Sequence, residues 1–142
     1  MADEKDKQTE AHQIWLEGFV ERHGGVAGTV HVREVEILEL RASVNIPDKV
    51  KALTQQIPHG KGMAGLAWER GVPVTTCNLK TDETGDVRPG AKAVDANAAV
   101  AIPIHDESGE VRAVVGIAYD GERDITDAEL EALHLQAATL PA

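Results

Sequence analysis

The stretch Ile57–Pro73, which reads IPHGKGMAGLAWERGVP, decides the fold of this chain. Gly60 and Gly62 predict a tight turn that leads into a short helix of about two turns. The apolar residues that follow keep the 3/4 spacing of one helix face: Met63, Leu66 and Ala67. Gly71 predicts the end of this helix, because a left-handed residue commonly closes one, and Pro73 cannot continue it.

The residues before this stretch predict a helix followed by a hairpin. Thr9–His23 has the pattern of an amphipathic helix that ends at Gly24, and residues 1–8 are expected to form a flexible tail. Apolar and polar residues alternate over Gly28–Asn45, which predicts two strands joined near Glu34–Glu36.

The middle of the chain predicts shorter elements. Asp48–Gln56 follows a proline, which suits the first turn of a helix, and Val50 and Leu53 are expected to face inward. Val72–Thr76 is expected to form a short strand. Thr81–Lys92 combines glycines, a proline and charged residues, so it predicts a loop.

The second half predicts a hairpin and a final helix. Ala98–His105 carries larger apolar residues on one face and small alanines on the other, and it is expected to pair with Val111–Tyr119 across the turn Asp106–Glu110. Thr126 and Glu129 form a capping box at the start of the last helix. The buried stripe of that helix is expected to be Leu130, Leu133, Ala137 and Leu140.

Length and composition limit the class of protein. The chain has 142 residues and a mass of 15.2 kDa, which fits a single domain over residues 9–142. The charged N-terminus and the single cysteine, Cys77, predict a cytoplasmic protein without a signal peptide, a spanning segment or an internal disulfide. A net charge of -10 repels phosphate groups, so neither nucleic acid nor a membrane surface is expected as a partner.

Together these elements resemble the GAF domain family, the small-molecule sensing module of bacterial and eukaryotic signalling proteins. Three stretches carry the resemblance: Ile57–Pro73, Ala98–Ile104 with Gly109, and Val115–Gly116 with Thr126–Leu133. The resemblance implies an α+β, GAF/PAS-like fold with an antiparallel sheet of about six strands. The terminal helices would lie on one face of this sheet, and short helices and loops would cover a ligand pocket on the other.

A dinucleotide site and a metal site are two alternatives to this interpretation. Gly60, Gly62 and Gly65 spell GxGxxG, but a dinucleotide site follows directly on a buried strand, and the preceding residues are polar and include Pro58. The six histidines show no metal-ligand spacing. No metal or cofactor is therefore expected.

Cys77 leaves one enzymatic alternative. Within the resembled family, free methionine-(R)-sulfoxide reductases use one thiolate to attack the sulfoxide sulfur and another thiol to resolve the intermediate. Cys77 is the only cysteine in this chain. A small buried cysteine at the end of a strand is the favoured interpretation, and no catalysis is expected.

The sequence therefore predicts a non-catalytic regulatory module that binds a small ligand, a partner protein or both, and acts by protein–protein contact. The alternatives are a redox enzyme that uses Cys77 and a purely structural dimerisation module that binds no ligand. A small polar metabolite is expected rather than a cyclic nucleotide. The resemblance implies that the pocket is lined by Met63, Trp68, Cys77, Arg88 and Asn97; Trp68 could equally be a packing residue.

The resemblance also implies a homodimer through the terminal helices. The apolar side chains expected at this contact are Trp15, Phe19, Leu133 and Leu140, which supply more apolar surface than one sheet face must cover.

Overall fold

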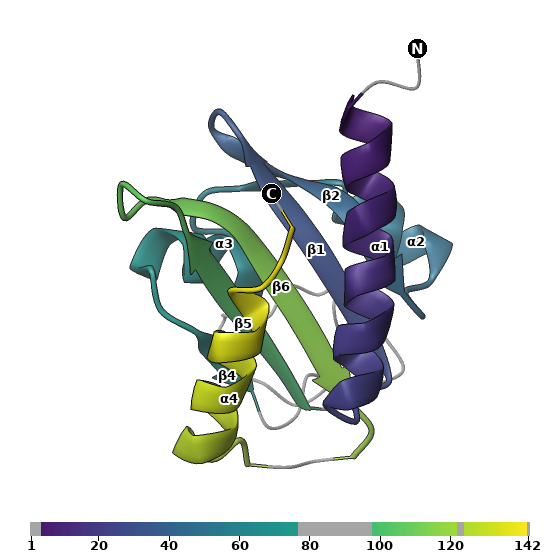
Figure 1. Ribbon diagram of the computed structural model, residues 1–142, viewed down its shortest axis with the longest axis vertical. Coiled ribbons are helices and arrows are strands. Elements are labelled where there is room, and N and C mark those ends of the chain that lie inside the picture. The colour runs from purple at the N-terminus through teal and green to yellow at the C-terminus, as the bar shows by residue number, and fades with distance from the viewer. Residues whose placement is uncertain (1–3, 77–97, 122–123, 142) are drawn as a thin grey trace.

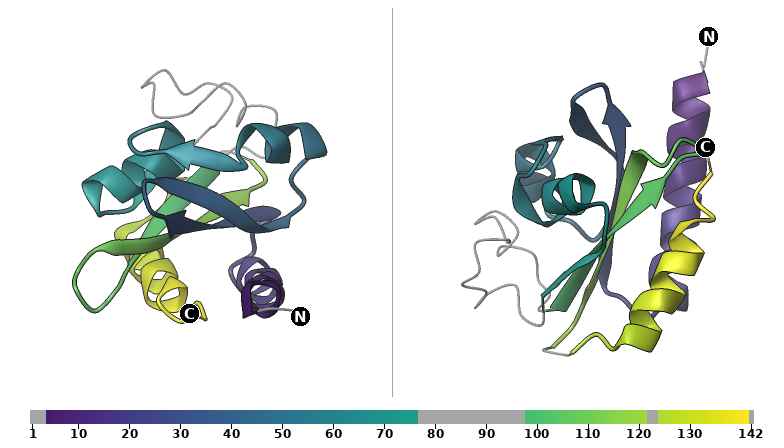
Figure 2. Two further views of the ribbon diagram at one scale, coloured as in Figure 1. Left: turned by 90° about the horizontal axis from the view of Figure 1, so that it is seen from above. Right: turned by 90° about the vertical axis from the view of Figure 1, so that its left-hand side faces the viewer.

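The computed structural model describes residues 4–76, 98–121 and 124–141. A single sheet carries two helices on each face: α1 and α4 lie on one side, and α2 and α3 on the other (Figures 1 and 2). In chain order the elements are α1 (Glu4–Arg22), β1 (Ala27–Glu34), β2 (Ile37–Val44), α2 (Asp48–Leu53), β3 (Gln56–Pro58), α3 (Gly62–Arg70), β4 (Val74–Thr76), β5 (Ala98–His105), β6 (Val111–Tyr119) and α4 (Asp127–Ala137).

The sheet has six strands in the order β3-β2-β1-β6-β5-β4, and all neighbours are antiparallel. The two hairpins, β1–β2 and β5–β6, meet where β1 pairs with β6, from Ala27 opposite Ala118 to Val32 opposite Ala113. The α+β class, the six-stranded antiparallel sheet and the placement of the helices on its two faces are as the sequence predicted.

The larger core lies between the sheet and the two terminal helices. The helices contribute Leu16, Phe19, Val20, Leu133 and Ala137, which pack against Val30, Val100, Val115 and Ile117 of the central strands. Burying one such large side chain stabilises a fold by about 1.5–3 kcal/mol, so this face supplies most of the hydrophobic stabilisation.

Most of the side chains expected at the dimer surface are used in contacts within the chain. Trp15 is half-buried, stacks on Phe19 with ring centroids 4.8 Å apart, and donates from Nε1 to Thr139 Oγ1 at 3.0 Å. Three of the four expected dimer contacts are instead buried inside the chain: Phe19, Leu133 and Leu140. Ile14 on α1 and Leu135 on α4 are the large apolar side chains that these helices expose, at 64% and 67%. The homodimer itself stays a prediction.

The turns around α3 form as the glycine pattern predicted. Gly60 and Gly62 have φ of 78° and 67°, and Gly71 ends the helix at φ 69°. The Gly60 amide donates to the Gly65 carbonyl at 3.0 Å, which folds β3 back against α3. At Gly65 a Cβ atom would lie 2.7 Å from the carbonyl oxygen of Pro58, so only glycine fits this contact.

Two predicted boundaries and the orientation of one side chain need correction. Helix α1 begins at Glu4 rather than Thr9, so the expected tail 1–8 is partly helical. Helix α2 ends at Leu53, and Gln56–Pro58 forms an edge strand instead of continuing the helix, because Leu38 of β2 pairs with Ile57. Leu53, which was expected to face inward, is 53% exposed.

The second half matches its prediction closely. Strands β5 and β6 have the predicted bounds, and Gly109 takes a φ of 89° in the turn between them. Thr126 caps α4, with its Oγ1 accepting from the Glu129 amide at 3.1 Å. The predicted loop Thr81–Lys92 lies outside the described residues.

The close packing at Gly65 gives a first testable prediction. Gly65→Ala is expected to lower the free energy of unfolding by about 1–3 kcal/mol, because the Pro58 carbonyl has to move away from the new methyl group. Gly18→Ala on α1 is the matched control, since a Cβ there meets nothing within 4 Å. It is expected to raise stability by about 0.5–1 kcal/mol, as alanine does in a helix. Equal urea midpoints for the two variants would show that the β3–α3 corner is not tightly packed.

Candidate ligand-binding site

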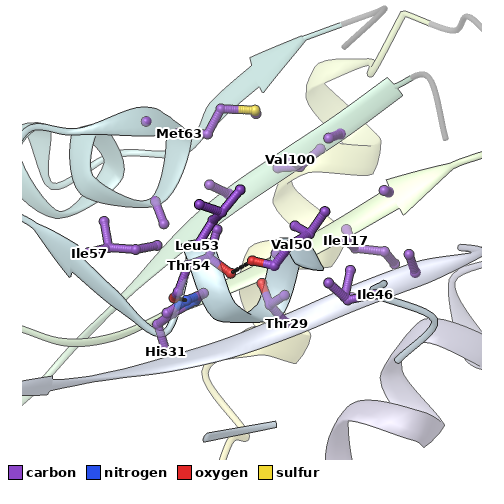
Figure 3. Close-up of a pocket in the computed structure, with 18 of the residues that line it drawn as sticks. Thr29, His31, Ile46, Val50, Leu53, Thr54, Ile57, Met63, Val100 and Ile117 are labelled. Atoms are coloured by element: carbon purple, nitrogen blue, oxygen red, sulfur yellow. Dashed lines mark hydrogen bonds between the residues drawn. The ribbon is translucent and has the colours of Figure 1, made fainter. Parts of the chain in front are cut away.

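A cavity of about 400 Å³ lies between the sheet and the two short helices (Figure 3). Its floor is formed by the central strands β1, β5 and β6, and its other described walls come from α2, β3 and the first turn of α3. It therefore lies on the face of the sheet opposite the terminal helices.

The floor of the cavity is made of small residues that are paired across three strands. One row across the sheet is Ala27–Ala118–Ala99, and another is Thr29–Gly116–Ala101. The larger Val30, Ile102 and Val115 of the same strands lie in the packed core on the other face. At Gly116 a Cβ atom would lie 2.7 Å from Thr29 Oγ1, so a larger residue there would force the Thr29 side chain to move. The cavity exists because these small side chains leave the space above them unfilled.

Apolar side chains form most of the described walls. Val50 and Leu53 come from α2, Ile46 precedes this helix, and Ile57 and Met63 come from β3 and α3 (Figure 3). Walls of this kind favour the apolar part of a ligand. The small polar metabolite that the sequence led us to expect stays a prediction.

His31 is the most deeply buried polar residue in the cavity wall, with only 3% of its surface exposed. Its Nε2 lies 2.9 Å from the carbonyl oxygen of Thr54, and because a carbonyl only accepts, Nε2 carries the proton. Nδ1 is then an acceptor, and it has no hydrogen-bond partner among the described residues. Burial lowers the pKa of His31 to about 4 and outweighs the opposing effect of the hydrogen bond, so this histidine is neutral at physiological pH.

The same hydrogen bond ties α2 to the sheet. Thr54 is the C-cap residue of α2, and its hydroxyl donates to the Val50 carbonyl at 2.8 Å (Figure 3). His31 on β1 therefore holds the end of the short helix that forms one cavity wall. This link was not predicted, because His31 and Thr54 are brought together only when the strands pair.

Of the five residues expected at the site, the structure describes Met63 and Trp68. Met63 lines the cavity. Trp68 is not among the described lining residues; it lies on α3, packs against the core between this helix and the sheet, and meets His59 edge-on, with ring centroids 4.6 Å apart. Cys77, Arg88 and Asn97 lie outside the described residues. A role for any of these five in binding stays a prediction.

Two kinds of feature are not found in the part of the chain that the structure describes. No three His, Cys, Asp or Glu side chains gather there into a group that could hold a metal ion. No helix in the same residues has the length and apolar character needed to cross a bilayer.

Comparisons with known proteins agree with this architecture. The family model described as GAF domain matches residues 9–140. No curated protein matches the sequence.

Several solved structures share the fold. A type II free methionine-R-sulfoxide reductase from Thermoplasma acidophilum aligns with a TM-score of 0.76 and 20% identity, over 97% of this chain and 94% of that one. The GAF domain of a phosphoenolpyruvate-protein phosphotransferase from Acinetobacter gives 0.75 and 16%, over 94% and 79%. The free methionine-R-sulfoxide reductase from Neisseria meningitidis, in complex with its substrate, gives 0.68 and 15%, over 89% and 75%. Identities this low establish a common fold alone.

The unfilled space above the floor can be tested with two neighbouring alanines. Ala99→Leu is expected to leave the free energy of unfolding unchanged or to raise it, because the added carbons enter the cavity. Ala98→Leu is the control, since Ala98 is fully buried in the packed core on the opposite face. It is expected to cost about 1–3 kcal/mol through overpacking. Chemical unfolding that shows the same loss for both variants would mean that the cavity is already filled by protein atoms.

We predict that the stability of the folded chain depends on pH because of His31. Its pKa is about 4 in the folded chain and 6.5 as the ordinary value, so the unfolded state binds the proton more readily between these limits. The contribution of neutral His31 to the free energy of unfolding is fully present above pH 6.5. It is lost as the pH falls toward 4, and the total loss is about 3 kcal/mol.

A single substitution isolates this contribution. His31→Gln keeps a donor for the Thr54 carbonyl but cannot be protonated, so urea unfolding should show a smaller loss of stability between pH 6.5 and 4 than in the wild type. Burial also lowers the pKa values of His12 and His23, so part of the loss will remain. Identical pH profiles for the two proteins would exclude His31 as the source.

Proposed function

The chain belongs to the GAF domain family, and on this basis we propose that it is a regulatory module without catalysis of its own. In this proposal it binds a small molecule in the cavity between the sheet and the two short helices. The bound state would then be read by another protein through contact.

The observation that carries the proposal is the pairing of small residues across the cavity floor. Alanine, glycine and threonine stand in register on β1, β6 and β5, and together they leave about 400 Å³ unfilled. Small-molecule sites in proteins commonly measure about 300–1,000 Å³ and are mostly apolar with a few polar groups. Thr29 and His31 supply polar groups at this site.

Helix α2 offers a route from the cavity to the surface. It has six residues and contributes Val50 and Leu53 to the cavity wall, while Leu53 is also half exposed to solvent. A ligand that contacts Val50 would shift this short helix against its hydrogen bond to His31. The surface around Leu53 would then differ between the free and the bound protein, which is what a partner needs to distinguish them.

Sulfoxide reduction is the second candidate function, because two of the solved structures above are free methionine-R-sulfoxide reductases. That chemistry needs a thiolate, and Cys77 is the single cysteine in the chain. Cys77 lies outside the described residues, and the neutral His31 uses its Nε2 proton to bind Thr54. Because the chain has no second cysteine to resolve the oxidised thiol, we favour binding over catalysis.

We also propose that the module forms a homodimer through the outer faces of α1 and α4. The exposed Ile14 and Leu135 would provide the apolar contacts there. The cavity lies on the opposite face, so dimerisation and ligand binding would use separate surfaces. A structural dimerisation module that binds no ligand is the remaining alternative, and it gives no reason for the cavity.

A thermal-shift screen of small metabolites tests the proposed function. A compound that binds only the folded state raises the melting temperature once its concentration exceeds its Kd. We expect mostly apolar compounds to do so for the wild type and to lose the effect in Ala99→Leu, which fills the cavity. Ala128→Leu, on the exposed surface of α4, should keep it.

Two outcomes would contradict the proposal. One is a screen in which no compound distinguishes the wild type from Ala99→Leu. The other is turnover of free methionine sulfoxide with an external thiol reductant that Cys77→Ser abolishes, which would establish the enzyme instead.

A further inference from the structure

The charge of the cavity lining differs from that of the whole chain. The protein has 24 acidic and 14 basic side chains. Among the described residues that line the cavity there is no acidic one, and Lys61 is the only one that is charged, since His31 is neutral. The described part of the lining therefore carries one positive charge and no negative one, although the chain as a whole is acidic.

Lys61 also marks the start of α3. It is the N-cap residue, it makes no side-chain cap hydrogen bond, and the next three residues, Gly62–Ala64, line the cavity with it. The first amides of a helix have no partner within the helix, and their dipoles favour negative charge. Cation and helix terminus thus act together at one end of the cavity.

The rest of the cavity is apolar, with one exception. Val50, Leu53 and Ile57 face the small floor residues across the space (Figure 3). The exception is His31, which is buried and whose Nδ1 lacks a hydrogen-bond partner among the described residues. A carboxylate can accept from the first amides of α3 beside the exposed Lys61, which a pure hydrocarbon cannot do, whereas His31 Nδ1 is an acceptor and needs a donor such as water.

From this juxtaposition we infer that the cavity selects amphipathic anions: molecules with an apolar body and one carboxylate head. The head lies at the first turn of α3 beside Lys61, and the body lies over the floor of β1, β5 and β6. This inference rests on the proposed function and specifies its class of ligand. Zwitterionic and cationic compounds with the same apolar body are disfavoured, because an added positive charge would face Lys61.

The sequence provides a direct probe of the cavity. There are two methionines, Met1 and Met63, and only Met63 is on α3. Selective ¹³C-methyl labelling of methionine gives two NMR signals, of which the Met63 signal reports on the cavity wall. Three probes share one chain length and differ in the head: octanoate, octanamide and octylamine.

We expect octanoate to shift the Met63 signal at about neutral pH and to bind roughly three- to tenfold more tightly than octanamide. Octylamine should bind most weakly of the three. Lys61→Gln should remove most of the preference for octanoate over octanamide, and added salt should reduce it. Lys49→Gln is the matched control, since Lys49 is exposed on α2 and is not among the lining residues; it should leave the preference unchanged.

The outcomes separate this inference from the proposed function. Equal affinities for octanoate and octanamide, or a preference that survives Lys61→Gln, would overturn the carboxylate inference while leaving the cavity as a binding site. If none of the three probes moves the Met63 signal at millimolar concentration, both the inference and a ligand-binding cavity are contradicted.

Discussion

The antiparallel pairing of β1 with β6 is the contact on which the rest of the structure depends. It joins a hairpin from the first third of the chain to one from the last third, and the register from Ala27 opposite Ala118 fixes which residues face each side. A shift of one residue would exchange the two faces. Large side chains would then face the short helices, and the small ones would face α1 and α4.

Because of this register, the two faces of the sheet have different surroundings. Val30, Val115 and Ile117 meet the terminal helices and form a packed core. Thr29, Gly116 and Ala118 meet a space that α2 and α3 cover without filling. The packed core and the cavity therefore lie on opposite faces of the same strands, which allows one face to remain underpacked while the other holds the fold together.

Much of the fold could be predicted because its signals are local. Gly71 ends α3 and Gly109 lies in the turn between β5 and β6, both at positive φ, and Thr126 caps α4. Each of these features was predicted from the residues next to it in the sequence. Strand β3 could not be predicted, because Gln56–Pro58 is short, contains a proline and becomes a strand only by pairing with β2. The cavity could not be predicted either. The sequence shows alanines on one face of β5, but the volume of the cavity depends on which small residues pair with them on β6 and β1. For the same reason His31 was not identified as a wall residue.

The sheet face carrying Ala99, Ala101 and Gly116 borders an apolar cavity that protein atoms leave unfilled. Diffraction from crystals pressurised with xenon can detect this space, because xenon enters apolar cavities without needing a specific contact. We expect a strong xenon peak between these floor residues and Val50 in the wild type, and no peak in Ala99→Leu. A cavity region filled by side chains, with no xenon bound in the wild type, would contradict it.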